Sequence, residues 1–463
     1  MTRSTGPHGH RRRRLRTGAL VSAGALLLGG PLMGTALGDA LVAEPYPDAE
    51  RHAPSPMPDR VILTPTEDTA TSQAVSWRTS SEVMTAQAEI SPMAPGPSFD
   101  DAATAVPAQS TEPMMADLGF PVRFHTVTFE GLDADTDYLY RVGDGTNWSE
   151  WMEFQTASGE AEPFSFIYYG DAQNEVHEHV SRVFRRAFVD RPQADLIVHA
   201  GDLVDVSTRD NEWGEWFDAA GWINGGINSL AIPGNHEYRS GVLAPYWDKQ
   251  FAFPDNGPES VNAEHPETAY HVDYEGVRFI GLNSNLNNDE DMQAQADYLD
   301  QALEENPGKW SVVTFHHPVF AMTGSRNNQR VRDYWDPILQ EHDVDLVLQG
   351  HDHTYGRGHQ QNAEQGRSGI HDGTVYVVSV SGAKMYSLND LGNWTDNGGQ
   401  PVSTAEGVQL YQLIDVDDDT ISYEARTADG VFHDGVRIEK RSNGAKQVYT
   451  VDEDGNRVKP GRG

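Results

Sequence analysis

Five apolar segments in the middle of this 463-residue sequence each end in side chains that can bind metal ions. Each segment is a short run of β-branched, leucine or aromatic residues, followed at once by Asp, Asn, Gln or His. The sequence has no cysteine, so a metal site must use carboxylate, amide and imidazole groups, which suit Fe, Zn or Mn. The polar residues, in chain order, are Asp171 and Gln173, Asp202 and Asp205, Asn235 and His236, His316 and His317, and His351 and His353.

The last of these groups lies in LQGHDHTYGR, residues 348–357, and it leaves three interpretations open. His351 and His353 can bind one ion together, can each bind one ion of a pair, or can be ordinary surface histidines. Taken singly the other groups are equally ambiguous, because Gly-Asp and Gly-Asn are common turn pairs. The recurrence of such groups after five successive apolar segments is what indicates a site.

The elements that must position these groups alternate between strands and helices from residue 164 onward. Apolar runs such as FSFIYY, ADLIVHA and VDLVL predict buried strands, and apolar residues at helical spacing follow the first of them. Sheets of this kind build their sites at the carboxyl ends of the strands. We therefore expect an α/β domain over residues 164–440 with the polar groups gathered at one edge, followed by a polar, frayed tail over 441–463.

The region before residue 164 has a different pattern of predicted elements. Six short alternating segments between residues 58 and 158, separated by Gly, Pro, Asp and Ser, predict an antiparallel β-sandwich. Trp77 is expected in its core, and Tyr138 is expected to form a structural tyrosine corner. A proline-rich linker, residues 39–57, precedes the sandwich.

The N-terminus predicts export. Residues 1–38 combine RRRRLR, a long uncharged run and a small-residue site at Ala36-Leu37-Gly38, which is typical of a secretory signal and compatible with the twin-arginine type. We expect a secreted or cell-envelope protein with no membrane association after cleavage. A formal net charge of −36 disfavours binding to nucleic acid. The sequence makes no prediction of oligomeric state.

The order GD…GDxxD…GNHE…H…GHDH is similar to that of the calcineurin-like metallophosphoesterases. Together with the predicted sandwich, it resembles bacterial purple acid phosphatase-like proteins, whose N-terminal domain is fibronectin type III-like. The resemblance implies a multidomain chain in which an all-β sandwich precedes a four-layer α/β/β/α core.

The resemblance also implies two metal ions per chain, with Asp202 as the bridge between them. It places His351 and His353 on different ions and favours His316 over His317 as a ligand, because the family pattern is His-x-Pro. Gln173 stands where the wider family often has a histidine, and we include its amide oxygen as a ligand. The first ion then has Asp171, Gln173, Asp202 and His353, and the second has Asp202, Asn235, His316 and His351.

The catalytic residues implied by the resemblance are His236, beside the scissile phosphate, and Asp205, which orients it. Purple acid phosphatases have a tyrosine at the position of Asp205, and its charge transfer to ferric iron gives their colour. We therefore expect a protein that is not purple, and a requirement for ferric iron stays open. We name His317 and Arg357 as substrate-binding candidates.

The implied function is that of a secreted phosphomonoesterase, which hydrolyses a phosphorylated small molecule by in-line attack of a metal-bound hydroxide. Two alternatives stay open: a phosphodiesterase or nucleotidase with the same metal centre, and a non-catalytic cell-surface binding protein.

Overall fold

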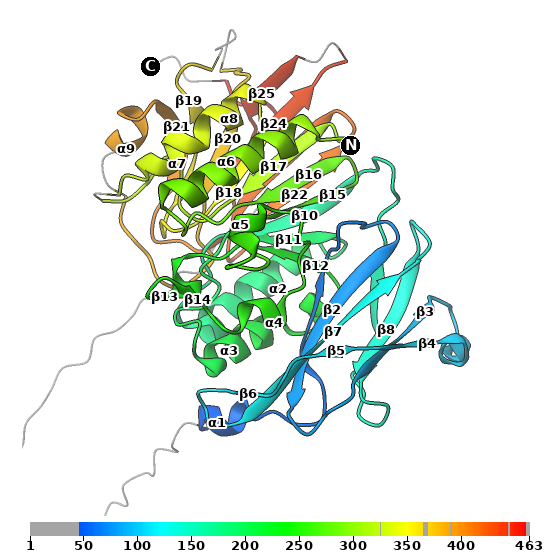
Figure 1. Ribbon diagram of the computed structural model, residues 1–463. Helices are drawn as coiled ribbons and strands as arrows, with labels where there is room; N and C mark the ends of the chain where they lie inside the picture. Colours follow the sequence, from blue (N-terminus) through cyan, green and yellow to red (C-terminus); the bar gives the residue numbers. More distant parts are fainter. Residues whose placement is uncertain (1–45, 325, 364–368, 389–390, 443–444, 460–463) are drawn as a thin grey trace, which may run out of the picture. The chain divides into compact units, whose positions relative to one another are not determined.

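The N-terminal strands form two antiparallel sheets in the computed structural model, which describes residues 46–463 except 325, 364–368, 389–390, 443–444 and 460–463 (Figure 1). Trp77 and Tyr138 lie in the core that the two sheets share. The hydroxyl of Tyr138 accepts a hydrogen bond from the backbone N–H of Asp133 at 2.9 Å, so this tyrosine is structural. The predicted β-sandwich is confirmed.

The sandwich contains three short strands that we did not predict, β4, β5 and β6, in a stretch rich in Pro, Ser and Ala. One sheet has the order β1-β2-β7-β5, with β6 also paired to β7, and the other has the order β4-β3-β8-β9. The strands are β1 (Asp59–Thr64), β2 (Ser72–Ser80), β3 (Gln87–Pro92), β4 (Thr104–Pro107), β5 (Gln109–Ser110), β6 (Met114–Met115), β7 (Pro121–Glu130), β8 (Asp137–Gly143) and β9 (Met152–Gln155).

Two seven-stranded sheets form the centre of the second region. The first has the order β12-β11-β10-β22-β23-β24-β25, and the second has the order β15-β16-β17-β18-β20-β19-β21. The first sheet comprises β10 (Phe164–Tyr169), β11 (Leu196–His199), β12 (Asn228–Ala231), β22 (Leu410–Asp417), β23 (Thr420–Thr427), β24 (Phe432–Lys440) and β25 (Lys446–Thr450). The second comprises β15 (Tyr270–Tyr274), β16 (Val277–Gly281), β17 (Trp310–Thr314), β18 (Leu346–Gln349), β19 (Tyr355–Gln360), β20 (Val375–Val378) and β21 (Gly399–Ala405).

Helices cover the outer face of each sheet, so the predicted four-layer α/β/β/α core is confirmed (Figure 1). Alternation along a strand explains the layers: Phe166 of β10 packs against Phe279 of the second sheet at 5.2 Å between ring centroids, whereas Tyr169 packs against Phe184 of α2. The first sheet is covered by α2 (Ser181–Asp190) and α3 (Asp210–Ala220), and the second by α6 (Asp289–Glu304), α7 (Gln329–Tyr334) and α8 (Asp336–Glu341).

Shorter elements lie in the linker and the loops. The helices are α1 (Asp48–Arg51), α4 (Trp247–Gln250), α5 (Glu259–Asn262) and α9 (Gly392–Thr395), with 3₁₀ or π turns η1 (Pro97–Ala102), η2 (Val176–Val180), η3 (Gly221–Gly225) and η4 (Asn235–Glu237). Strands β13 (Tyr238–Arg239) and β14 (Val242–Leu243) pair into a small hairpin.

The strands that precede the polar groups are parallel within each sheet. Strands β10, β11 and β12 run parallel in the first sheet, and β16, β17 and β18 run parallel in the second. Carboxyl ends of parallel neighbours meet at one edge, so the loops after β10, β11, β12, β17 and β18 come together.

The prediction of a frayed polar tail after residue 440 is wrong for β25. This strand pairs with β24 from Val436↔Thr450 to Lys440↔Lys446 and completes the first sheet. Val448 is fully buried, and the Nζ of Lys446 donates to the carbonyl of Asp343 at 2.8 Å. Lys446 and Val448 face the interior of the domain, although the strand is polar in its overall composition.

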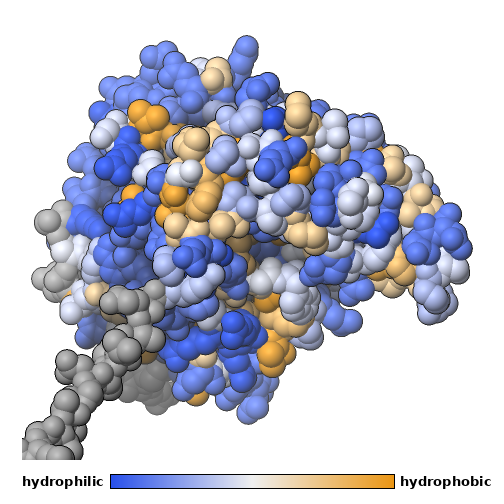
Figure 2. All heavy atoms as spheres, turned by 90° about the horizontal axis from the view of Figure 1, so that it is seen from below, coloured by the Kyte–Doolittle hydropathy of each residue, from blue (hydrophilic) through white to orange (hydrophobic). Residues whose placement is uncertain are grey.

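Hydrophilic residues cover most of the face shown in Figure 2, with hydrophobic residues in small groups, as the large negative charge leads one to expect. In the part of the chain that the structure describes, no helix is both long enough and apolar enough to span a bilayer. The predicted signal, residues 1–38, lies outside the described residues.

A buried charge cluster joins the sandwich to α3. Asp210, at the start of α3, binds Arg60 through two contacts of 2.9 Å and Arg78 through one of 2.8 Å. All three residues are less than a tenth exposed. Burial raises the pKa of Asp210, but Arg60 and Arg78 outweigh it and hold this pKa below its usual range.

Replacing Asp210 with alanine should lower the free energy of unfolding by about 3–5 kcal/mol, because it leaves two buried guanidinium groups with one carboxylate fewer. Since the folded-state pKa of Asp210 is depressed, its contribution is present at neutral pH and is lost as the pH falls through that pKa. Denaturant unfolding at pH 7 measures the change, with the exposed Asp101→Ala as the matched control. Equal effects of the two substitutions would contradict the prediction.

Candidate metal centre

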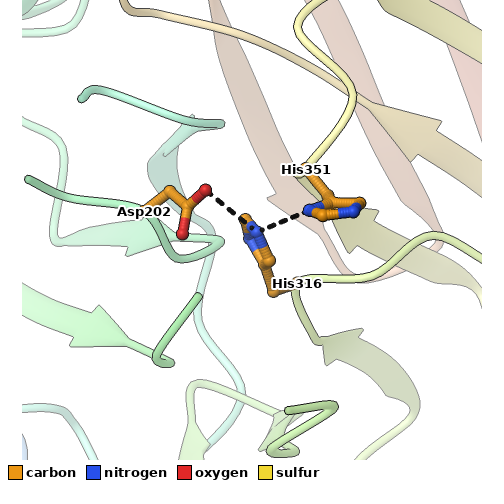
Figure 3. Close-up of side chains that lie close together, drawn as sticks. All are labelled: Asp202, His316 and His351. Carbon is orange, nitrogen blue, oxygen red and sulfur yellow. Dashed lines mark hydrogen bonds and ion pairs between the residues drawn. The ribbon is translucent and has the colours of Figure 1, made fainter. Parts of the chain in front are cut away.

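Two groups of acidic and imidazole side chains meet at the carboxyl edge of the sheets, and they share one residue. In each group, one ligand atom per residue lies within 4.8 Å of the others. Asp202, His316 and His351 form one group (Figure 3), and Asp171, Asp202 and His353 form the other. The structure thus brings the aspartates and histidines of each predicted ligand set together, with Asp202 in both groups, and their binding of two ions stays a prediction.

The hydrogen bonds of His316 show that its group needs a positive charge. Nδ1 lies 2.9 Å from the carbonyl of Ala200 and therefore carries a proton. Nε2 lies 3.2 Å from Asp202 Oδ2, from Asn235 Oδ1 and from Nδ1 of His351. The two oxygens are acceptors, so either a proton on Nε2 or a metal ion among these atoms stabilises the group.

The second ligand group contains a buried acceptor atom that has no hydrogen-bond donor in the part of the chain that the structure describes. Nδ1 of His353 lies 2.7 Å from the carbonyl of Lys384, so Nε2 presents a lone pair to Asp171 Oδ2 at 3.1 Å. That carboxylate oxygen is buried and makes no hydrogen bond with the described residues. Both groups fit a metal ion, and in the second group the buried Asp171 Oδ2 is the acceptor left without a donor among the described residues.

Gln173 lies against the second group, as a ligand there would. Its Nε2 is 3.0 Å from Asp202 Oδ2 and 3.0 Å from Nε2 of His353, while its Oε1 is buried without a partner among the described residues. Exchanging the two amide atoms, which have nearly the same shape, turns the oxygen toward the ligand group. The assignment of Gln173 as a ligand stays a prediction.

Electrostatics lead to the same requirement for positive charge. Burial raises the pKa of Asp202, but His316 and His236 outweigh it and hold this pKa well below its usual range. Burial lowers the pKa of His316, but Asp202 and Asp171 outweigh it and raise this pKa to about 9. The cluster therefore attracts either a proton or a metal ion, and metal binding displaces the proton.

The backbone at two ligands is held in a conformation that non-glycine residues rarely adopt. Asp202 has φ = 51° and His351 has φ = 71°. Such residues persist where the surrounding structure fixes them, commonly at functional sites. Gly234 permits the close approach of two loops, because a Cβ there would lie 2.2 Å from Asp202 Oδ1.

A buried carboxylate, Glu237, fixes the loops that carry the ligands. It is fully buried. Its oxygens accept backbone N–H bonds of 2.9 Å from Asp202, 2.9 Å from Leu203 and 2.7 Å from Gly234. Burial, and then the charge of Asp202, raise the pKa of Glu237 to about 8.

Glu237→Gln should weaken metal binding by about 10–100-fold without removing a ligand, the usual effect of losing a partner that orients ligands. A neutral amide has one acceptor oxygen in place of two, and its NH₂ group would face backbone N–H donors. Competition with a coloured chelator measures the affinity, and Glu259→Gln, at an exposed position, is the control. Unchanged affinity would show that these hydrogen bonds do not position Asp202.

Asp352, between the two histidines, is a positioning residue that sequence reasoning missed. It is fully buried and accepts bonds from the N–H of Thr323 at 3.3 Å, the hydroxyl of Thr323 at 3.1 Å and the guanidinium of Arg326. Thr323 and Arg326 thereby hold the turn that directs His351 and His353 to different groups. An acidic residue flanked by two histidines was the available signal.

His236 lies beside the metal groups and belongs to neither. Its backbone N–H donates to Asp202 Oδ1 at 2.8 Å, and its Nδ1 lies 2.5 Å from the carbonyl oxygen and 3.4 Å from the carboxylate of Asp205. The side chain is 24% exposed, so Nε2 is left for a molecule that reaches the site. Asp205, not Glu237, holds the ring.

Of the two substrate-binding candidates, His317 lies near the centre and Arg357 does not. The ring of His317 packs against that of His351 at 4.2 Å between centroids, and its Nδ1 contacts the hydroxyl of Ser284. Burial, and then the charge of His316, lower the pKa of His317 to about 3, so the ring is neutral. A role of His317 in substrate binding stays a prediction.

The prediction that Arg357 contacts substrate is wrong. Its side chain is 2% exposed and binds both carboxylate oxygens of Asp434, at 2.6 and 2.8 Å. This ion pair connects β19 of the second sheet with β24 of the first, so the guanidinium faces the interior between the sheets.

Comparison with known proteins agrees with this geometry. Residues 58–156 match the purple acid phosphatase N-terminal domain, and residues 165–355 match the calcineurin-like phosphoesterase family. Purple acid phosphatase 23 of Arabidopsis thaliana is 24% identical over 50% of this chain, and the match covers 57% of that protein. An uncharacterized protein of Mycobacterium tuberculosis is 25% identical over 70% of this chain and 69% of its own.

Solved structures share the fold at lower identity. A purple acid phosphatase from yellow lupin seeds has a TM-score of 0.66 at 17% identity, covering 84% of this chain and 75% of the lupin chain. PhoD has a TM-score of 0.55 at 12% identity, covering 85% of this chain and 92% of its own. The chain thus contains a region similar to the calcineurin-like phosphoesterases, preceded by a region similar to the purple acid phosphatase N-terminal domain.

Proposed function

We propose that the protein is an exported dinuclear-metal phosphohydrolase that acts on phosphomonoesters. The observation that carries this proposal is the pair of ligand groups that share Asp202, beside a partly exposed His236 that binds neither group. Two adjacent metal positions and a separate imidazole are what phosphate ester hydrolysis requires: charge neutralisation at phosphorus and a proton for the leaving group.

The ligands favour Fe, Zn or Mn, because carboxylate, imidazole and amide donors are present and sulfur is not. When bound, such ions supply an activated water and neutralise the negative charge of the phosphate. The side chains of the protein position the ligand loops and orient the proton donor. Asp202 and Glu237 fix the loops at the correct spacing, and Asp205 orients His236.

His236 is the group that we assign to proton transfer. Its Nδ1–H is held by the carbonyl of Asp205, so Nε2 is free to hold a proton and to give it to the leaving oxygen. The same protonated ring can stabilise charge on the phosphoryl oxygens. These two roles differ in how they depend on the leaving group.

The test compares hydrolysis of p-nitrophenyl phosphate and bis(p-nitrophenyl) phosphate, with and without a strong chelator. The proposal expects chelator-sensitive activity that is higher on the monoester. Higher activity on the diester would make the protein a phosphodiesterase with the same centre. Inactivity of fully metal-loaded protein on both would refute hydrolysis altogether.

Export is proposed from the N-terminal sequence alone. Arg12-Arg13-Arg14-Leu15 and the following uncharged run predict a signal. N-terminal sequencing of protein recovered from the culture medium tests the proposal. A mature chain that begins near residue 39 is the expected result, and retention of residues 1–38 on intracellular protein would refute it.

A further inference from the structure

The segment that follows β20 runs directly alongside the candidate metal centre. The backbone N–H of Gly382 donates to the carbonyl of Asp171 at 2.6 Å. Further along, the N–H of Tyr386 donates to the carbonyl of His353 at 3.0 Å, and the carbonyl of Lys384 accepts from the ring of His353 at 2.7 Å. The side chains of Lys384 and Tyr386 therefore stand at the rim of the centre.

Two cationic side chains lie near the ring of Tyr386 at this rim. Its ring packs against His353 at 4.5 Å between centroids. The guanidinium of Arg326 lies 5.3 Å from the centroid of the tyrosine ring, and Nζ of Lys384 lies 5.9 Å from it. All three side chains are partly exposed, so they are within reach of a molecule at the metal centre.

The two cations differ in how their charge is balanced. Arg326 is paired with the buried carboxylate of Asp352. The ammonium of Lys384 has neither an ion pair nor a hydrogen bond among the residues that the structure describes. Four other lysines are each paired with an aspartate, and these are Lys249, Lys309, Lys440 and Lys446.

An unpaired lysine beside the site is unexpected in a chain with 70 acidic and 34 basic residues. Carboxylates are abundant, and of the five other lysines only Lys459 also has no ion pair among the described residues. A charge left without a partner at the rim of an anion-binding centre is available for an anionic group of the ligand. Tyr386 keeps it there by a cation–π contact without neutralising it.

We propose that Lys384 binds a second anionic group, a carboxylate or a further phosphate, of substrates whose scissile phosphate lies at the metal centre. This inference rests on the proposed phosphohydrolase function. His236, which serves the scissile phosphate, is held by the loop of Asp202 and Asp205, whereas Lys384 is held by His353 on the other ligand group. The lysine therefore meets a different part of the substrate and acts on specificity.

Binding of two matched compounds tests this proposal. 3-Phosphoglycerate has a carboxylate where glycerol 3-phosphate has a neutral hydroxymethyl group, and the rest of the two molecules is closely similar. Calorimetric titration of the metal-loaded protein gives the Kd of each compound if it is not hydrolysed, and steady-state kinetics gives its kcat/KM if it is. The unsubstituted protein should bind 3-phosphoglycerate more tightly, and Lys384→Gln should weaken that binding by about tenfold, the effect of one hydrogen bond to a charged group.

The proposal is judged by comparing the loss of affinity between the two compounds and between the two lysine variants. The loss for glycerol 3-phosphate should be several-fold smaller, and the difference should shrink as salt rises. Lys459→Gln is the matched control, because Lys459 is exposed and also has no ion pair among the described residues. Equal losses for both compounds would overturn the proposal, as would an effect of Lys459→Gln as large as that of Lys384→Gln. Lys384-dependent discrimination in a metal-loaded protein that also hydrolyses neither p-nitrophenyl phosphate nor its bis-ester would refute the phosphohydrolase and leave the anion site standing.

Discussion

Asp202→Ala should remove metal from both positions and lower kcat/KM by more than about a thousandfold. A single lost electrostatic contact at an active site already costs on the order of 10²–10³ in rate. Asp202 is the one residue common to the two ligand groups identified among the described residues. Elemental analysis of the purified variant, together with p-nitrophenyl phosphate kinetics, measures both effects.

Asp205→Ala is the matched control for this prediction. It removes a carboxylate from the same loop, but the backbone carbonyl that lies 2.5 Å from His236 Nδ1 remains. Metal content should be unchanged and the loss of activity much smaller. Asp202→Asn keeps the shape of the side chain and serves if the alanine variant does not fold. Full metal occupancy in either Asp202 variant would show that this residue does not bridge.

His236→Ala should keep nearly full metal content and lower kcat by about two to four orders of magnitude, the usual contribution of a positioned acid. We expect metal content and kcat to respond differently, because His236 lies outside both ligand groups while its ring is held by Asp205. Elemental analysis and steady-state kinetics on the same preparation provide the measurement. Loss of metal along with activity would make His236 a ligand or a support for one.

The leaving group reveals which role His236 has. p-Nitrophenolate leaves without needing a proton, whereas an alkyl phosphate releases a poor alkoxide leaving group. If His236 protonates the leaving oxygen, the loss on an alkyl phosphate should be larger than on p-nitrophenyl phosphate. Equal losses would assign the ring to stabilising charge on the phosphoryl oxygens.

The ligands of the candidate centre could be predicted from sequence because each lies immediately after a strand. A strand is signalled by a local apolar pattern, and parallel neighbours present their ends at one edge. Asp171, Asp202, His316, His351 and His353 are therefore brought together by elements that short windows of sequence identify. The sandwich, with Trp77 and Tyr138 in its core, was predictable for the same reason.

Residues that support the centre were harder to predict, because their partners are distant in the chain. Glu237 and Asp352 are ordinary carboxylates in the sequence, and only the fold shows that they accept hydrogen bonds from the loops that position the ligands. Arg357 follows the last ligand closely, yet its partner Asp434 is 77 residues away. Local sequence can indicate a charged side chain, but it does not say which carboxylate neutralises it.

The sequence by itself determined the types of ligand, their order and the strands that carry them, since these follow from local periodicity and side-chain chemistry. The tertiary structure decided which polar side chains are buried and that β25 completes the first sheet. It also decided that Lys384 stands beside His353 without a carboxylate partner among the described residues. The physical reason is that burial and charge pairing arise from contacts between segments far apart in the chain, which local patterns do not encode.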